Sequence, residues 1–166
     1  MVEKNLPGLM IGGHAVTALG HPRATFDLDL LIPRDAATEW KAALQKLNYS
    51  LFAESANFHQ YEAPAEFPLA PIDLMLVDHD VFAALELTKN NIKPIAVPSV
   101  EGLIALKLHA AKQPTRAECE KDWSDIIALF KAHQLRLDEE TIHATVLRHG
   151  GPAAINRIQA ALARGT

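Results

Sequence analysis

The sequence predicts an α+β (mixed α/β) fold, in which a small mixed sheet with flanking helices precedes a helical C-terminal part. Short segments that alternate apolar and polar residues, typical of strands, occur before Pro98. After Ser99, apolar residues recur at helical spacing instead. Hydrophobic residues make up 49% and charged residues 22% of the 166 residues. This balance is typical of a globular chain and excludes disordered, collagen-like and coiled-coil classes.

The front of the chain mixes strands and helices. A short helix follows Gly12-Gly13 and ends at Gly20, and Pro33 opens a helix that runs to about Leu47. Residues 63–71 hold three prolines and are expected to form a loop. Alternating or apolar runs predict strands over 25–32, 49–53, 58–62, 72–77 and 92–97.

The back of the chain is expected to be helical throughout. Ser99 is a suitable N-cap, and Pro152 suits a first helical position because its missing N–H costs little there. The predicted helices cover 99–112, 117–133, 139–149 and 152–164. We therefore expect a core over 1–98 and a helical region over 99–166 that packs on it.

Several classes of protein are disfavoured by simple features. The single cysteine, Cys119, cannot form an internal disulfide and is expected to be a small apolar helix residue. Met1–Asn5 carries both charges and leads into no apolar run, so no signal peptide is expected. No window offers the ~20 apolar residues of a membrane span. The sequence predicts a cytoplasmic protein without a membrane partner.

Charge is distributed unevenly along the chain, whose net charge is −4. Residues 1–106 hold 7 Lys/Arg and 13 Asp/Glu, whereas residues 107–166 hold 9 and 7. No strong basic patch supports a large nucleic-acid footprint, although a small or locally held nucleic acid is compatible with the pattern.

Two carboxylates stand two residues apart in the first predicted strand. Alternation places Phe26, Leu28 and Leu30 on the core face and Asp27 and Asp29 together on the other. Because neighbouring carboxylates repel, a divalent cation such as Mg²⁺ or Mn²⁺ between them is one interpretation. The other is the outward polar face of an edge strand.

A third carboxylate strengthens the metal interpretation. Asp73 interrupts residues 72–77, whose two faces are otherwise apolar, so this strand is expected to be central and covered. A lone carboxylate there is costly without a partner. If this strand lies beside residues 25–31, three carboxylates meet in a two-metal site of the kind used for phosphoryl and nucleotidyl transfer.

Gly12-Gly13 supplies a complementary feature, because glycines at a helix start let the backbone approach a phosphate. Gly150-Gly151 is instead interpreted as a helix end. Arg23 could hold a nucleotide phosphate or neutralise the acidic cluster. His59, His109 and His143 are expected at the surface, and the role of His14 stays open.

Together these motifs resemble the polymerase-beta-like nucleotidyltransferase superfamily. Within it, the chain is most similar to bacterial abortive-infection and minimal nucleotidyltransferase proteins, which are toxin-like. The core of the resemblance is formed by Gly12, Gly13, Arg23, Thr25, Asp27, Asp29 and Asp73. A downstream Lys…Arg…Lys-Asp-x-x-Asp signature is matched by Lys107, Arg116, Lys121, Asp122 and Asp125.

The resemblance implies transfer of NMP from an NTP to a hydroxyl acceptor, with release of pyrophosphate. Asp27 and Asp29 would hold two Mg²⁺ (or Mn²⁺) ions, and Asp73 would share one and help to deprotonate the hydroxyl. The implied nucleotide contacts are Gly12, Gly13, Arg23, Thr25, Lys107 and Lys121, with Asp122 and Asp125 as secondary site residues. A tRNA or protein acceptor and a cognate antitoxin fit the toxin-like relatives. The alternatives are an antibiotic-type small-molecule acceptor and a nucleotide-binding module without turnover.

The downstream residues also have simpler interpretations. Lys107 falls within the apolar stripe of its helix, so its stem could pack while its ammonium reaches solvent. Lys121 and Asp125 are four residues apart and could form only a surface pair.

Overall fold

The computed structural model describes residues 6–92, 94–112 and 119–164. The chain divides into two compact units. One unit comprises the described residues up to Ala15 together with Arg23–Pro98. The other comprises Val16–Pro22 together with the described residues from Ser99 onward, so that helix α1 (Gly12–Ala18) contributes to both.

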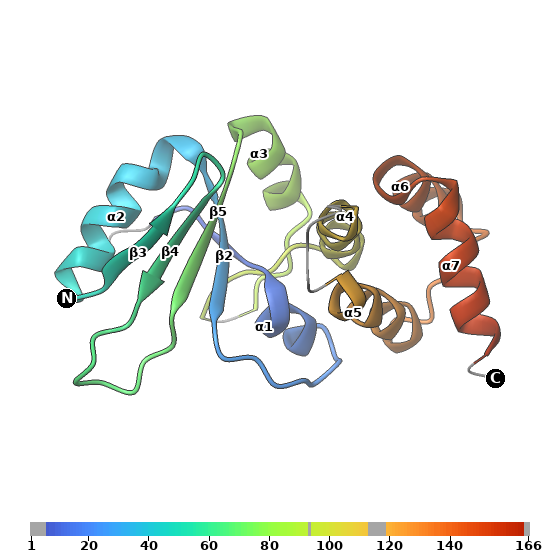
Figure 1. The fold of residues 1–166 in the computed structure, drawn as a ribbon. Helices are drawn as coiled ribbons and strands as arrows, with labels where there is room; N and C mark the ends of the chain where they lie inside the picture. Colours follow the sequence, from blue (N-terminus) through green and yellow to red (C-terminus); the bar gives the residue numbers. More distant parts are fainter. Residues whose placement is uncertain (1–5, 93, 113–118, 165–166) are drawn as a thin grey trace. The chain divides into compact units, whose positions relative to one another are not determined.

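The first unit contains a five-stranded sheet with the order β1-β2-β5-β4-β3 (Figure 1). Strands β2 and β5 are parallel, and the other neighbours are antiparallel. This mixed sheet with its helices confirms the predicted fold class. The strands are β1 (Leu9–Met10), β2 (Leu28–Pro33), β3 (Ser50–Glu54), β4 (Phe58–Glu62) and β5 (Ile72–Val77).

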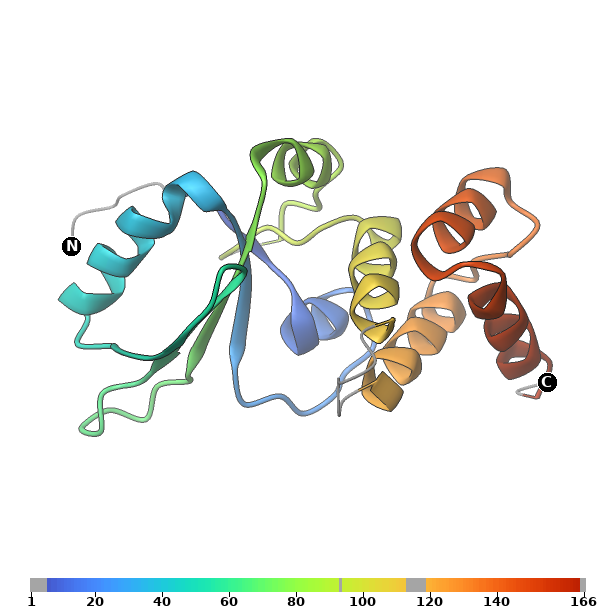
Figure 2. The same cartoon turned by 45° about the horizontal axis from the view of Figure 1, so that its top comes forward.

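One face of the sheet forms a hydrophobic core with helix α2 (Ala37–Lys46), which follows a short 3₁₀ turn at Arg34–Ala36. Helix α3 (His79–Leu87) lies on the other side of the sheet (Figures 1 and 2). The buried residues of the core cluster are Leu30, Ile32, Leu44, Tyr49, Tyr61, Ile72, Leu74 and Leu76. Alternate residues of β2 and β5 therefore point away from this core, as strand periodicity requires.

Strand β5 is central, as expected, with β2 on one side and β4 on the other. Its register with β2 pairs Leu30 with Leu74 on the core face and Asp29 with Asp73 on the opposite face. The condition for three carboxylates to meet, that β5 lies beside β2, is thus fulfilled.

Two strand predictions need correction. The strand predicted over 25–32 starts only at Leu28, and Phe26 is 87% exposed rather than part of the core face. The strand predicted over 92–97 is absent among its described residues, where a single bridge joins Asn90 to Val97. Pro94 lacks a backbone N–H and cannot complete a ladder in that segment.

Two elements were not predicted from the sequence. Strand β1 has only two residues, too few for an alternating pattern to be recognised. Helix α3 starts after Asp78, whose extended backbone suits an N-cap position, and it buries Phe82.

The second unit is helical. Its helices are α4 (Val100–Ala111), α5 (Cys119–Ala132), α6 (Glu140–Gly150) and α7 (Pro152–Ala163). The Ser99 hydroxyl caps α4 by accepting from the Gly102 N–H at 3.1 Å, and Pro152 occupies the first turn of α7, both as predicted. None of the helices in the described part of the chain is long and apolar enough to span a lipid bilayer.

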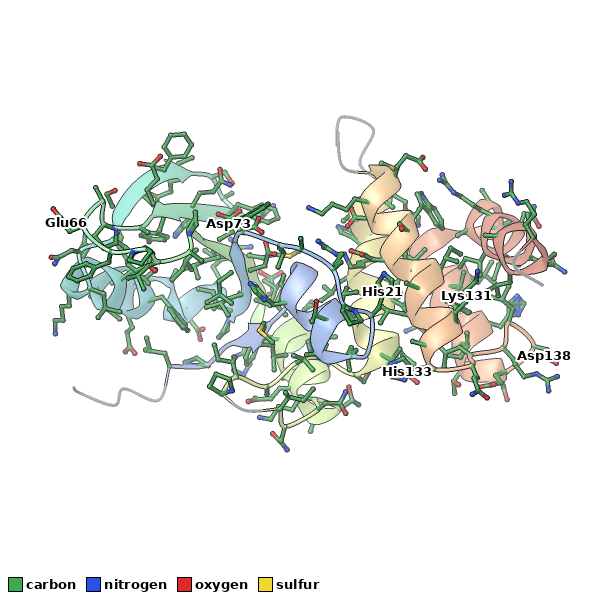
Figure 3. The ribbon with its side chains drawn as sticks, turned by 90° about the horizontal axis from the view of Figure 1, so that it is seen from below. His21, Glu66, Asp73, Lys131, His133 and Asp138 are labelled. Carbon is green, nitrogen blue, oxygen red and sulfur yellow. The ribbon has the colours of Figure 1, made fainter. Side chains whose placement is uncertain are left out.

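A hollow of about 510 Å³ lies in this helical unit, in the region of His21 and Lys131 that is labelled in Figure 3. Close to it in sequence, the His133 ring Nε2 lies 2.7 Å from the Leu19 carbonyl oxygen. The hollow is lined by His21, Ser124, Ile127, Ala128, Lys131 and Ala132, none of which is a predicted site residue.

Candidate metal and nucleotide site

Three carboxylates meet where β2 and β5 begin. Each of Asp27, Asp29 and Asp73 offers one oxygen, and these three oxygens lie within 4.8 Å of one another. All three residues are half-buried, and Asp73 is labelled on the sheet in Figure 3. The sequence prediction that these three residues meet on one sheet face agrees with the structure.

Asp27 reaches the cluster by a different route from the one predicted. It precedes β2, and its Oδ1 accepts a hydrogen bond from the Thr25 hydroxyl at 2.8 Å. Such short-range side-chain bonds compete with regular strand structure, which explains why β2 starts late. A bend at Asp27, rather than strand alternation, brings Asp27 beside Asp29.

Asp73 is held from the neighbouring strand. Gln60 on β4 is its register partner, and Gln60 Nε2 donates to Asp73 Oδ2 at 3.0 Å. Burial raises the pKa of Asp73, the Gln60 hydrogen bond lowers it, and the nearby Asp27 charge raises it, with a net upward shift. Gln60 was not predicted as a site residue, because its contact depends on strand order.

Gly12 lies directly against the cluster. The Ile11 N–H donates to the Asp29 carbonyl at 2.9 Å, and this bond places the following residue over the Asp29 side chain. A Cβ at Gly12 would lie 1.8 Å from Asp29 Oδ2, and its φ of +60° also favours glycine. Glycine is therefore required here by both space and backbone conformation.

Gly13 makes an equally close approach to two other predicted site residues. A Cβ at this position would lie 2.7 Å from the Thr25 side chain and 2.9 Å from Arg23 Cζ. Gly12, Gly13, Arg23, Thr25 and the carboxylates are thus brought together in the first unit.

This donor set fits a divalent cation. Carboxylate oxygens are the ligands preferred by Mg²⁺ and Mn²⁺, and three of them close together repel one another unless positive charge lies nearby. The Thr25 hydroxyl and the Gln60 amide donate hydrogen bonds to Asp27 and Asp73. A cation bound by the three oxygens would keep both of these hydrogen bonds.

The predicted downstream residues lie in the helical unit. Lys107 is buried, and its Nζ lies 3.2 Å from Asp122 Oδ1 and 2.6 Å from Asp125 Oδ2. Its ammonium therefore does not reach solvent, contrary to the simpler interpretation. Lys121 is exposed as the surface interpretation requires, whereas Asp125 is buried. Nucleotide contacts by Lys107 and Lys121 stay predictions, and Arg116 lies outside the described residues.

One histidine prediction was wrong. His59 is only 8% exposed, because the β4 alternation directs it toward the α2 side of the sheet, where Glu54 Oε1 lies 3.3 Å from its Nε2. His109 and His143 are exposed as expected, and His14 is half-buried.

Comparison with known proteins identifies the fold of the chain. No protein-family model matches the chain, and no curated protein matches it. The solution structure of the antibiotic-resistance factor ANT(2'')-Ia matches 98% of this chain and 89% of its own, with a TM-score of 0.63 and 20% identity. A crystal structure of ANT(2'')-Ia in complex with adenylyl-2''-tobramycin matches 89% and 88%, with a TM-score of 0.64 and 19% identity.

A third solved structure, the Megavirus polyadenylate synthase, is also similar. It matches 78% of this chain at a TM-score of 0.57 and 14% identity, and the match spans 29% of the viral protein. The chain has the fold of nucleotidyltransferases, which confirms the resemblance drawn from the sequence motifs at the level of fold.

Proposed function

We propose that this chain is a metal-dependent nucleotidyltransferase that transfers NMP from an NTP to a hydroxyl acceptor and releases pyrophosphate. The observation that carries the proposal is the meeting of Asp27, Asp29 and Asp73 oxygens within 4.8 Å. Gly12 lies directly against the Asp29 side chain, and Gly13 lies directly against Thr25 and Arg23. The fold shared with nucleotidyltransferases supports the same class of reaction.

The three carboxylates would hold the divalent cations, Mg²⁺ or Mn²⁺. Such ions neutralise phosphate charge and increase the acidity of a bound hydroxyl. Gly12 and Gly13 would lie along the phosphates, because their missing side chains leave backbone N–H groups accessible. Arg23 and Thr25, which line Gly13, are the neighbouring candidates for phosphate contact.

Asp73 is the candidate proton acceptor. The acceptor oxygen forms a bond to the α-phosphorus while the bond from that phosphorus to the β-phosphate oxygen breaks, and pyrophosphate leaves. The hydroxyl proton passes to a carboxylate oxygen of Asp73. The Gln60 hydrogen bond holds the Asp73 carboxylate within the cluster, in a position suited to receive this proton.

The acceptor is expected to be a small hydroxylated molecule that carries amines. Between Lys46 and Lys89 the chain has no Lys or Arg, and this stretch includes β3, β4 and β5. Its acidic residues are Glu54, Glu62, Glu66, Asp73, Asp78, Asp80 and Glu86. A negative field of this kind attracts a cationic acceptor and opposes a polyanion.

Two cations in the described part of the unit, Arg34 and Lys41, contact residues of this stretch other than Asp73. Arg34 bonds to the β3–β4 turn at Ala56 and Asn57, and Lys41 lies 3.5 Å from Glu54. Glu62, two residues beyond Gln60 on β4, is exposed.

Three alternatives are to be separated by experiment. They are a tRNA acceptor, a protein acceptor with a cognate antitoxin, and nucleotide binding without turnover.

The test is to incubate the protein with each labelled NTP and Mg²⁺, together with amine-bearing sugars or total tRNA. Pyrophosphate release and an acceptor mass increased by one NMP are expected with an amine-bearing sugar. EDTA should abolish both signals, and Asp27→Asn should lower them by roughly 10²- to 10³-fold. Transfer to tRNA alone would replace the acceptor assignment, and no transfer with any NTP and acceptor would refute the enzyme.

A further inference from the structure

Gln60 completes a row of three polar side chains across the sheet. It lies opposite Asp73 in the β4–β5 register, and Asp73 lies opposite Asp29 in the β2–β5 register. The Gln60 amide donates to Asp73 Oδ2 at 3.0 Å. We propose that Gln60 is the positioning residue for Asp73, fixing how this carboxylate faces the cation site; the inference rests on the proposed function.

The direction of the bond explains the positioning. The terminal torsion of an aspartate is soft, so a carboxylate without a fixed partner samples a broad range of orientations. Gln60 pulls Oδ2 toward β4, on one side of the central strand. The bond leaves the second oxygen of Asp73 without a constraint from Gln60, and the register partner of Asp73 on the opposite side, in β2, is Asp29.

The chemistry of the amide also suits this role. A lysine at this position would bring a permanent positive charge to Asp73 and compete with a divalent cation. Gln60 instead donates a hydrogen bond while leaving the full negative charge of Asp73 for the cation. Its side chain is exposed, so the bond contributes little to folding stability and its main effect is on orientation.

Partners that hold a metal ligand in this way commonly change metal affinity by about 10- to 100-fold when they are removed. The test measures binding of Mn²⁺ alone to the full chain by titration calorimetry. Gln60→Met keeps the side-chain length but removes the donor, and it should weaken Mn²⁺ binding by about 10-fold. Gln45→Met, the same change at an exposed position of α2, should leave the affinity unchanged.

Two further variants separate positioning from other roles. In an Asp73→Asn background, adding Gln60→Met should change Mn²⁺ affinity no further, because the bond acts through Asp73. Gln60→Glu preserves shape but places a second carboxylate against Asp73 and should also weaken binding. Gln60→Lys should weaken it more than Gln60→Met.

The outcomes distinguish the two proposals. If Gln60→Met bound Mn²⁺ with wild-type affinity while Asp27→Asn lost Mn²⁺ binding, the positioning role of Gln60 would be overturned. The proposed enzyme activity would be unaffected by that result. A further loss of affinity on adding Gln60→Met to Asp73→Asn would also overturn it. Wild-type protein that neither binds Mn²⁺ nor transfers nucleotide would refute both.

Discussion

The chain carries two clusters of carboxylates that are built in different ways. In the helical unit, Asp122 and Asp125 are 4% and 1% exposed, and the ammonium of Lys107 lies within 3.2 Å of both. In the sheet unit, Asp27, Asp29 and Asp73 are half-buried, and their oxygens lie within 4.8 Å of one another. Uncharged groups, the Thr25 hydroxyl and the Gln60 amide, donate to two of them.

The difference separates a structural cluster from a binding cluster. In the helical unit the cation is the Lys107 ammonium, which is a permanent part of the chain. Because this ion pair is buried, removing the ammonium costs folding stability. The Lys107 cluster therefore links α4 to α5. In the sheet cluster, the Gln60 amide orients Asp73 without neutralising it, and the partial exposure of the three carboxylates leaves a route for an external cation. We therefore expect mutations in the first cluster to change stability and mutations in the second to change metal binding.

The largest expected effect is that of Lys107→Met. Removing the ammonium leaves two buried carboxylates without this partner, and breaking a buried ion pair costs about 3–5 kcal/mol. Chemical denaturation should show a loss of this size. Lys131→Met, at an exposed position of the neighbouring helix α5, should change the free energy of unfolding by less than about 0.5 kcal/mol.

The same variant tests the predicted nucleotide contact of Lys107. Adding Asp122→Asn and Asp125→Asn to Lys107→Met should restore much of the stability, because these changes remove the two buried negative charges that Lys107 balances. If Lys107→Met instead kept wild-type stability and raised only the KM for NTP, the ammonium would belong to the triphosphate site.

The second prediction concerns Asp27→Asn in the sheet cluster. Losing one ligand charge should lower kcat by roughly 10²- to 10³-fold, equivalent to about 3–4 kcal/mol of transition-state stabilisation. Stability should fall much less than in Lys107→Met, because Asp27 is half-buried and asparagine keeps an oxygen that can accept from the Thr25 hydroxyl. Paired kinetic and denaturation measurements check this, and an unfolded variant would contradict the division between the clusters.

Much of the fold could be predicted from the sequence because local patterns determine it. The strand predicted over 72–77 matches β5 at both ends, and the helix caps at Ser99 and Pro152 are local signals. Failures occurred where a side chain or a proline overrode the pattern. Thr25 bends the chain before β2, and Pro94 prevents a ladder.

The site was predictable in part for the same reason. Asp27, Asp29 and Asp73 stand out in apolar strands, and their meeting required only that β2 and β5 be neighbours. Gln60 could not be found, because nothing local shows which strand pairs with β5 on its second side. The direction of the Lys107 ammonium likewise depends on how α4 packs against α5, which helical spacing alone does not determine.

The third prediction compares two glycines that both have positive φ. Gly12→Ala places a Cβ 1.8 Å from Asp29 Oδ2, whereas Gly20→Ala meets nothing within 4 Å. Both should lose about 1–2 kcal/mol from backbone strain. Only Gly12→Ala should also displace Asp29 and weaken Mn²⁺ binding, measured by calorimetry. Equal Mn²⁺ affinities in the two variants would show that the contact with Asp29 is unimportant for the cation.

The smallest effect is expected for Thr25→Val, which preserves shape but removes the hydroxyl that donates to Asp27 Oδ1 at 2.8 Å. Loss of one such bond costs about 1 kcal/mol, which corresponds to a roughly 5-fold weaker Mn²⁺ affinity if Thr25 acts by orienting Asp27. The exposed Thr38→Val on α2 is the matched control. A higher KM for NTP with unchanged Mn²⁺ affinity would instead assign the hydroxyl to the nucleotide. Thr25→Val therefore tests whether this hydroxyl serves the Asp27 carboxylate of the sheet cluster or the nucleotide.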